Sequence, residues 1–114
     1  MLLTVLINRL AKTKDIQRTT MRGRSFFNPN FVIKYYASQS SSPRFTVTVA
    51  TRVSKRAVVR NKLKRVIRET VRTRMGHFRP GDYVIIVRPS LAAIPPKEIP
   101  QLILSVMTRS RLYT

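Results

Sequence analysis

Two stretches of the chain alternate apolar and polar positions in the way that strands do. They are residues 31–36, FVIKYY, and residues 44–52, RFTVTVATR. A period of two predicts strands that are buried on one face only. The second face of 44–52 carries small, polar and cationic side chains, so it is available to a ligand. Residues 39–43 are rich in serine and predict a hairpin loop between these two strands.

Two further segments predict strands from other signals. Residues 83–87, YVIIV, form a near-continuous apolar run. Such a run is typical of a strand that is buried on both faces beside a parallel neighbour. Residues 25–27 predict a short strand of their own, which Asn28-Pro29 ends.

Helical patterns cover much of the remaining chain. The first covers residues 12–22 and ends at Gly23. The second, from Arg56 to Met75, is the strongest in the sequence, and Gly76 ends it.

A last helix is expected from about residue 96 to 108, with Pro100 in its first turn, where a missing N–H costs least. The order of elements is then helix, strands, helix, strand, helix. This order predicts an α+β fold in which helices and one mixed sheet of about four strands form a two-layer sandwich. At 114 residues, we expect residues 1–114 to form a single domain.

The charge balance points to a partner. Lys and Arg number 23 against 4 Asp and Glu, which gives a formal charge of +19. A polyanion relieves the resulting self-repulsion, and nucleic acid is the usual one because bound cations release counterions from phosphates. A protein that coats membranes is disfavoured, because no single amphipathic basic helix dominates. The hydrophobic content of 43% also exceeds that of a disordered tail.

The chain has no cysteine, which excludes disulfides, zinc knuckles and thiol catalysis and fits a reducing cytoplasm. Residues 1–7, MLLTVLI, have no preceding basic region and no small-residue cleavage site, so a secretory signal is not expected. No run reaches the ~20 apolar residues of a membrane span.

The helix from Arg56 to Met75 predicts two different faces at about 100° per residue. The apolar arc, which should bury against the sheet, contains Val59, Leu63, Val66, Ile67 and Thr70. The outward face carries a row four residues apart and a second row beside it: Arg60, Lys64, Arg68 and Arg72, with Asn61 and Arg65.

Solvated helix faces normally mix charges of both signs, whereas Glu69 is the only acid between Asp15 and Asp82. Like charges at this spacing weaken an isolated helix. An anionic partner against this face is therefore favoured over plain solvation. Arginine suits that role because its planar fork binds phosphate oxygens in pairs and stacks on bases.

The string RNKLKRVIRE at residues 60–69 resembles the Arg-Asn-x-x-Lys-Arg-x-x-Arg signature of the protein subunit of bacterial ribonuclease P. The resemblance extends over nearly the whole chain. It includes Asn8-Arg9-Leu10, Lys12, Asp15, Gly23, Phe31-Val32, the strand entry Asp82-Tyr83-Val84 and the terminal Arg111-Leu112-Tyr113.

This resemblance implies a sheet with a left-handed strand–helix–strand crossover, which periodicity alone would not predict because right-handed crossovers are the rule. It also implies a function. The protein would be the non-catalytic subunit of a tRNA-processing endonuclease, monomeric in a 1:1 complex with a catalytic RNA. The RNA, with Mg²⁺, would remove the 5′ leader of precursor tRNA, and the protein would aid substrate affinity and the use of Mg²⁺.

The resemblance assigns two sets of site residues. The set expected to contact the catalytic RNA is Arg56, Arg60, Asn61, Lys62, Lys64, Arg65, Arg68 and Arg72. The set expected to form a cleft for the single-stranded leader is Arg9, Lys12, Ile16, Val32, Lys34, Thr46, Thr48 and Arg52. Of these, the polar strand faces independently supply Lys34, Thr48 and Arg52. The family usually has aromatic residues where this chain has Ile16, Thr20 and Lys34, so charge and van der Waals contact would carry more of leader binding.

No protein active site or protein-bound metal is expected. Two-metal hydrolysis needs clustered carboxylates, whereas Asp15, Glu69, Asp82 and Glu98 are scattered along the sequence. We expect Glu69 to pair with an arginine one turn away. The one histidine, His77, lacks the partner that acid–base catalysis requires.

Two alternatives share the size and charge of this chain. A ribosomal or RNA-assembly protein would co-purify with ribosomal subunits, and the signature string argues against it. A DNA-binding regulator would usually dimerise to match two half-sites, and no apolar patch is left over for a dimer seam.

Overall fold

The computed structural model describes residues 10–114. The predicted roles of Arg9 and residues 1–8 lie outside this range. The helices are α2 (Thr13–Arg22), α3 (Ala57–Arg72) and α4 (Ile99–Arg109), and the strands are β1 (Arg24–Asn28), β2 (Phe31–Tyr36), β3 (Pro43–Thr48) and β4 (Gly81–Val87). Three 3-10 turns complete the described elements: Met75–His77, Pro89–Ala93 and Pro96–Glu98.

The four strands form one mixed sheet in the order β1-β2-β4-β3. β4 is antiparallel to β2 and parallel to β3, which confirms the predicted parallel neighbour. The predicted hairpin between β2 and β3 is wrong, because β4 lies between these two strands. The apolar run of β4 is buried on both faces at all but one position, and the centre of a sheet provides that environment.

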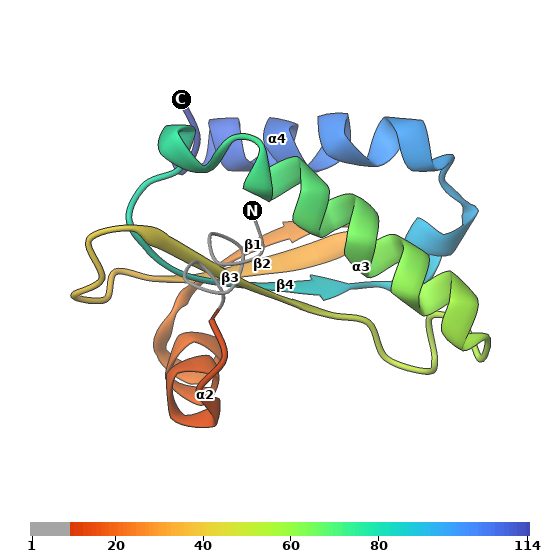
Figure 1. Ribbon diagram of the computed structural model, residues 1–114, viewed down its shortest axis with the longest axis horizontal. Helices are drawn as coiled ribbons and strands as arrows, with labels where there is room; N and C mark the ends of the chain where they lie inside the picture. The colour runs from red at the N-terminus through yellow and green to blue at the C-terminus, as the bar shows by residue number, and fades with distance from the viewer. Residues whose placement is uncertain (1–9) are drawn as a thin grey trace.

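α3 and α4 cover one face of the sheet, whereas α2 lies on the opposite side (Figure 1). In Figure 1, β3 and β4 both run to the right, α3 returns to the left above them, and β4 lies behind β3. This path is a left-handed crossover, as the family resemblance implied. It departs from the right-handed connection that parallel strands normally adopt.

The strand expected over residues 44–52 is shorter than predicted. β3 ends at Thr48, and the backbone N–H of Val53 donates to the oxygen of Ala50 (3.0 Å), which closes a turn. Val49 and Val53 are buried in the core on either side of this turn. The turn removes Arg52 from the sheet, so its predicted place on the outward strand face is wrong.

α3 ends at Arg72, three residues before the predicted end, and Gly76 does not end it. Thr73 caps the helix, because its backbone N–H and its hydroxyl both donate to the oxygen of Glu69. Tighter 3-10 turns then carry the chain past Gly76. The helix predicted from residue 96 begins as a 3-10 turn and becomes α4 at Ile99, with Pro100 in its first turn as expected.

The core lies between the sheet and the pair α3 and α4. It confirms most of the predicted arc of α3, since Leu63, Ile67 and Thr70 are buried; Val59 and Val66 are partly buried. The sheet contributes inward side chains from alternate positions of β2, β3 and β4, and α4 contributes its own buried stripe. These residues are Phe31, Ile33, Tyr35, Phe45, Val47, Tyr83, Ile85 and Val87 from the sheet, with Ile99, Ile103, Val106 and Met107 from α4.

An aromatic cluster fills one end of this core. The ring of Tyr83 stacks on Phe45 with centroids 4.4 Å apart and lies 4.9 Å from Tyr35. Its hydroxyl donates to the backbone oxygen of Arg79 (2.6 Å). Burial raises the pKa of Tyr83 well above its usual value, because the phenolate would lose its water.

This raised pKa makes the fold sensitive to alkali. Below pH ~10, Tyr83 is protonated in both the folded and the unfolded chain, so its stabilising contribution is complete. Above that pH the unfolded chain loses the proton first, and the free energy of unfolding falls until the folded-state pKa is passed. At pH 8 we expect Tyr83→Phe to reduce the free energy of unfolding by about 1 kcal/mol, because the hydrogen bond from the Tyr83 hydroxyl to Arg79 is lost. Between pH 10 and 11, the free energy of unfolding should fall less steeply in Tyr83→Phe than in wild type. Urea unfolding across this range checks it, with Tyr113→Phe as control. Parallel profiles for wild type and Tyr83→Phe would contradict it.

Candidate nucleic-acid interface

The outward side of α3 carries the cationic residues that the sequence predicted. Asn61, Arg65 and Arg68 are exposed, and Lys64 and Arg72 are partly exposed. Together with Glu69 these five residues line a surface hollow of about 390 Å³. We call these five, with Arg60, the α3 basic surface. The helix can hold them together because its opposite side is fixed in the core.

Two cations of the α3 basic surface are already engaged within the protein. Arg72 forms an ion pair with Glu69, as expected, and this arginine lowers the pKa of the Glu69 carboxyl. Arg60 donates from Nη1 to the backbone oxygen of Ser54 (2.8 Å). Within residues 10–114, by contrast, the side chains of Lys64, Arg65 and Arg68 make no hydrogen bond or ion pair. These three are therefore ready to bind an external anion.

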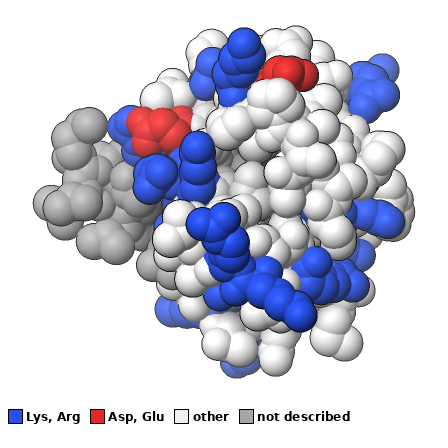
Figure 2. Space-filling model, turned by 90° about the vertical axis from the view of Figure 1, so that its right-hand side faces the viewer, with Lys and Arg blue, Asp and Glu red and all other residues white. Residues whose placement is uncertain are grey.

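Two predicted members of this set lie apart from it. Lys62 is exposed but does not line the hollow, because it lies about 200° around the helix from Lys64. Arg56 is exposed at the N-cap, just before the helix begins. Figure 2 shows the end of the molecule on the right of Figure 1, where Lys and Arg side chains cover large areas and Asp and Glu only small ones.

A second surface lies on the sheet face opposite the core. Paired residues of neighbouring strands share a face, so the register places Phe27, Val32, Ile86 and Thr48 in one row across all four strands. The next row is Ser25, Lys34, Val84 and Thr46. All of these except Val84 are partly or fully exposed. We call these two rows the open sheet face.

α2 covers the end of this face at the third row, Tyr36, Asp82 and Arg44. Asp82 is fully buried and accepts two bonds from Arg44, one from Nε and one from Nη2, both 2.8 Å long. Arg18 of α2 reaches the same carboxylate at 3.4 Å. This bonding to Asp82 raises the pKa of Arg44.

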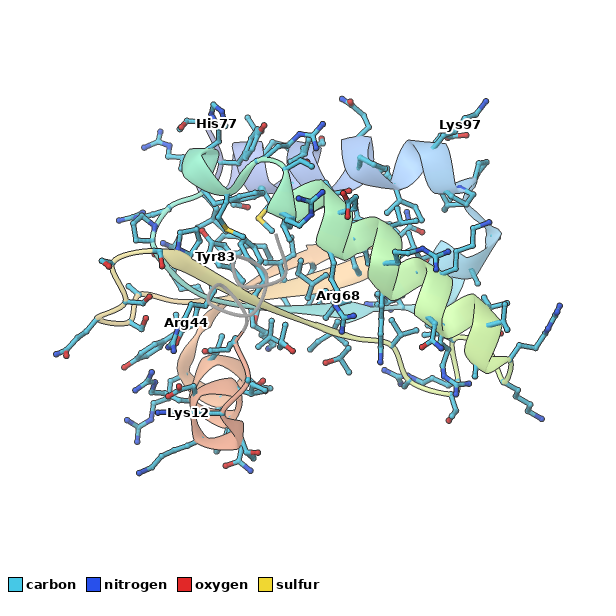
Figure 3. The ribbon with its side chains drawn as sticks, viewed as in Figure 1. Lys12, Arg44, Arg68, His77, Tyr83 and Lys97 are labelled. Carbon is cyan, nitrogen blue, oxygen red and sulfur yellow. The ribbon has the colours of Figure 1, made fainter. Side chains whose placement is uncertain are left out.

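A second carboxylate joins this cluster from α2. Asp15 lies 3.3 Å from Arg18 and 3.5 Å from Arg44. The fold thus brings together two acids that are far apart in the sequence, and each is neutralised by the same two arginines. Figure 3 shows Arg44 on the α2 side of the sheet and Tyr83 on the core side. We call Asp15, Arg18, Arg44 and Asp82 the α2 ion cluster.

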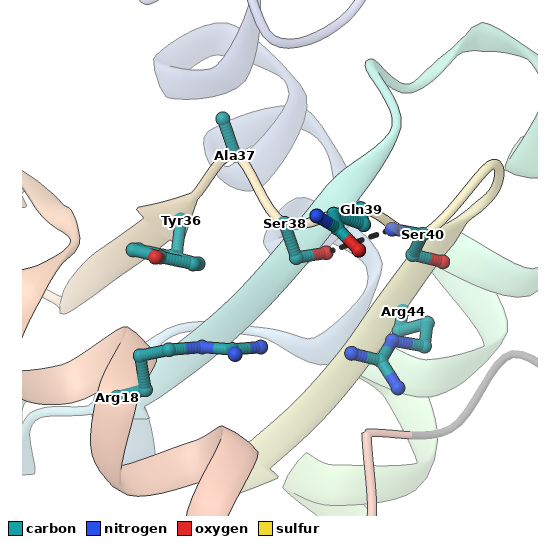
Figure 4. Close-up of a pocket in the computed structure, with 7 residues that line it drawn as sticks. All are labelled: Arg18, Tyr36, Ala37, Ser38, Gln39, Ser40 and Arg44. Atoms are coloured by element: carbon teal, nitrogen blue, oxygen red, sulfur yellow. Dashed lines mark hydrogen bonds between the residues drawn. The ribbon is translucent and has the colours of Figure 1, made fainter.

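The α2 ion cluster borders a polar hollow of about 640 Å³ (Figure 4). The loop after β2 forms its other wall, where Ser38 donates to Asp82 (3.1 Å). The Arg18 guanidinium covers the ring of Tyr36 at 4.7 Å. Both arginines at this hollow are therefore committed to internal partners. The α2 ion cluster attaches α2 to the sheet through these ion pairs.

Gly23 allows α2 to approach the sheet closely. A Cβ at this position would lie 2.3 Å from the backbone oxygen of Thr19 and 2.7 Å from that of Tyr35. Backbone atoms cannot yield at such distances, so no larger residue fits. The end of α2 predicted at Gly23 is confirmed, and this glycine fixes the helix beside the open sheet face.

The structure gathers most of the predicted leader set around this face. Val32, Lys34, Thr46 and Thr48 lie on it directly. Lys12 is exposed at the N-cap of α2, and Ile16 is partly exposed in the first turn of this helix. Arg52 lies on the turn beyond β3, off the sheet, and Arg9 lies outside the described residues.

Sequence reasoning missed other residues of these surfaces. Phe27 and Ile86 extend the open sheet face, and the Arg44–Asp82 pair places α2. The period-two pattern of residues 25–27 was too short to assign faces. No local signal links Arg44 with Asp82, because the pair depends on the parallel register of β3 and β4. In the described part of the chain, no helix is long and apolar enough to cross a membrane.

Comparisons with known proteins agree on one family. The family model described as Ribonuclease P matches residues 7–111. The chain is similar to the ribonuclease P protein component of Brevibacillus brevis, with 38% identity over 92% of this chain and 84% of that protein. The corresponding protein of Bacillus velezensis is 33% identical over 93% of this chain and 91% of its own length.

Solved structures extend the likeness to the whole fold. An RNase P protein mutant of Staphylococcus aureus, with defective mRNA degradation activity, superposes with a TM-score of 0.91 at 26% identity, covering 97% of this chain and 94% of that one. The RNase P protein of Thermotoga maritima, in complex with 1-(4-fluorophenyl)-2-thiourea, gives a TM-score of 0.81 at 27% identity, covering 89% and 98%. Sequence signature, crossover and fold agree, and this chain belongs to the ribonuclease P protein family.

Proposed function

We propose that this chain is the RNA-binding subunit of a ribonuclease P ribonucleoprotein that removes the 5′ leader of precursor tRNA. The observation that carries this proposal is the α3 basic surface. Lys64, Arg65 and Arg68 stand on one helix face without an internal partner in residues 10–114. A folded RNA supplies phosphates at the density that such a surface needs.

The chemistry is assigned to the RNA partner and its Mg²⁺. The two acids that the fold brings together, Asp15 and Asp82, are bonded to Arg18 and Arg44 and are not available as metal ligands. The protein contributes binding energy and positive charge. Both reduce the Mg²⁺ that the RNA partner requires to fold and to hold its substrate.

The open sheet face is the proposed site for the single-stranded leader. It combines apolar and polar side chains with the Lys34 ammonium, and Lys12 lies at the N-cap of the neighbouring helix α2. Single-stranded nucleic acid is bound by such mixed surfaces, in which cations follow the backbone and apolar groups contact the bases. The α3 basic surface then holds the catalytic RNA, and the sheet holds the substrate.

Reconstitution tests the proposal directly. Cleavage of precursor tRNA by a bacterial ribonuclease P RNA is measured across Mg²⁺ concentrations with and without this protein. We expect the protein to lower the Mg²⁺ needed for half-maximal cleavage. If the protein did not stimulate cleavage at moderate salt, the proposal would be wrong. Co-purification of the protein with ribosomal subunits would favour the ribosomal alternative.

The α3 basic surface can be tested separately. We expect Arg65→Ala and Arg68→Ala each to weaken binding to the catalytic RNA and to reduce its salt slope by about one for each phosphate that is no longer bound. The free energy of unfolding should change by no more than about 0.5 kcal/mol, because both side chains are exposed.

Filter binding across a range of salt concentrations measures the slope. Arg109→Ala provides a control, since it removes one exposed arginine from the end of α4. If Arg65→Ala and Arg68→Ala leave the slope at the wild-type value, these residues do not contact phosphate.

A further inference from the structure

We propose that Phe27 is a base-stacking residue of the open sheet face, where its ring receives an unpaired base of single-stranded RNA. This inference rests on the proposed leader-binding role of that face. It adds a residue of β1 to the predicted leader-binding residues, whose members on the sheet come from β2 and β3. It also assigns a preference, because a ring distinguishes single-stranded nucleic acid, whose bases are free to stack, from a polyanion without bases.

The first observation is exposure. Phe27 is 70% exposed, and it is the only aromatic residue in the exposed class among residues 10–114. Every other Phe or Tyr ring in that range is buried or partly covered. Within the same range, no ring contact or cation–π contact involves Phe27. Its neighbour Phe26, by contrast, packs against the core and lies 5.3 Å from the Arg24 guanidinium.

The second observation is placement. Phe27 pairs with Val32 and so begins the row that continues through Ile86 to Thr48. The ring therefore stands at the edge of a surface that crosses the whole sheet. The tyrosine on this side of the sheet, Tyr36, is covered by Arg18. Phe27 is thus the aromatic ring that the fold leaves open on this side, among the residues that the structure describes.

The third observation is a cation one row away. Lys34 Nζ donates to Ser25 Oγ at 2.7 Å, so the ammonium is held over β1. Ser25 and Phe27 are two residues apart on the same face of one strand, so their Cα atoms are about 6.6–6.8 Å apart. Because the ring and the ammonium lie in neighbouring rows of one face, a single nucleotide can contact both, with its base on the ring and a neighbouring phosphate on the cation. This pairing of ring and charge is the usual recognition of single-stranded nucleic acid.

Charge decides between RNA and a protein as the occupant. An apolar protein interface would need a continuous apolar patch around Phe27. The apolar row that Phe27 begins is instead only three residues long and is bordered by Lys34, Thr46 and Thr48, in a chain of formal charge +19. A polyanion with planar apolar groups fits this composition, and single-stranded RNA is such a ligand.

Tryptophan fluorescence offers a direct test, because the chain has no tryptophan. Phe27→Trp places a single reporter at the site, and a base stacked on the indole quenches its emission. Met21→Trp is the matched control, since Met21 is 82% exposed and projects from the opposite side of α2 to the buried Thr19. We expect precursor tRNA to quench Phe27→Trp and to leave Met21→Trp unchanged. Equal quenching of both, or of neither while RNA binds, would overturn the proposal.

Affinity gives a second readout. We expect Phe27→Ala to bind precursor tRNA roughly 5- to 150-fold more weakly in the holoenzyme, the range for removal of one base stack. Binding of mature tRNA, which has no leader, should not change. Phe27→Leu keeps apolar bulk without the ring and should resemble Phe27→Ala. Wild-type affinity in Phe27→Leu would show that the contact is not stacking.

The two proposals fail in distinguishable ways. If wild-type holoenzyme binds precursor and mature tRNA equally, the leader is not bound and the proposed function of the open sheet face is wrong. If the leader strengthens binding in wild type and equally in Phe27→Ala, leader binding stands and the role of Phe27 is refuted.

Discussion

Replacing Leu63 with aspartate is expected to unfold the protein. Leu63 is 5% exposed and lies on the side of α3 that faces the core. The change removes apolar packing and places a carboxylate among apolar side chains. The combined destabilisation is about 5 kcal/mol or more, comparable to the whole stability of a small domain.

Val58→Asp is the matched control for this experiment. Val58 is on the same helix but is 72% exposed, so the same substitution meets water there. Circular dichroism and urea unfolding should report a native Val58→Asp and an unfolded Leu63→Asp. A folded Leu63→Asp with native stability would mean that α3 is not fixed by its apolar side, and the α3 basic surface would lose its support.

Replacing Asp82 with alanine is expected to have the second largest effect. Asp82 is fully buried, and its carboxylate accepts the two 2.8 Å bonds from Arg44. Its removal leaves the Arg44 guanidinium partly buried without its main partner. Breaking a buried ion pair from one side costs about 3–5 kcal/mol. We also expect α2 to loosen, since Arg18 loses the same carboxylate.

Two further variants separate charge from packing in this experiment. Asp82→Ala combined with Arg44→Met removes both charges, and it should recover part of the stability because no unpaired ion remains. Asp15→Ala should cost at most about 1 kcal/mol, since Asp15 is partly exposed and its ion pairs are 3.3 and 3.5 Å long. Urea unfolding measures all three, and hydrogen exchange in α2 reports its attachment. Equal losses of stability for Asp15→Ala and Asp82→Ala would contradict the central place of Asp82.

Local patterns predicted the helices and strands of this chain well. The alternation of residues 31–36, the apolar run at 83–87 and the buried side of α3 are all confirmed. These signals depend on burial of one face or of both, which a short window of sequence records. The predicted ends of β3 and α3 were wrong, because a turn follows Thr48 and Thr73 caps α3 after Arg72.

Pairing between elements could not be read from the same patterns. A serine-rich loop after β2 is compatible with a hairpin, but β2 pairs with β1 on one side and on the other with β4, from much later in the chain. The same limit hid the α2 ion cluster and the face of Phe27. The α3 basic surface was accessible to prediction because one helix carries it, whereas the open sheet face depends on the register of four strands.

The central position of β4 has a consequence for how the chain reaches its fold. Phe31 pairs with Val87 and Pro43 with Gly81, so both neighbours of β4 are made long before it. During synthesis, β2 and β3 remain without their shared partner until residues 81–87 have left the ribosome. Pairings of this sequence separation slow folding, because the loop entropy opposes closure before the strands gain any hydrogen bonds. We therefore expect β3 to join β2 in one sheet only late, after α3 and β4 have been synthesised.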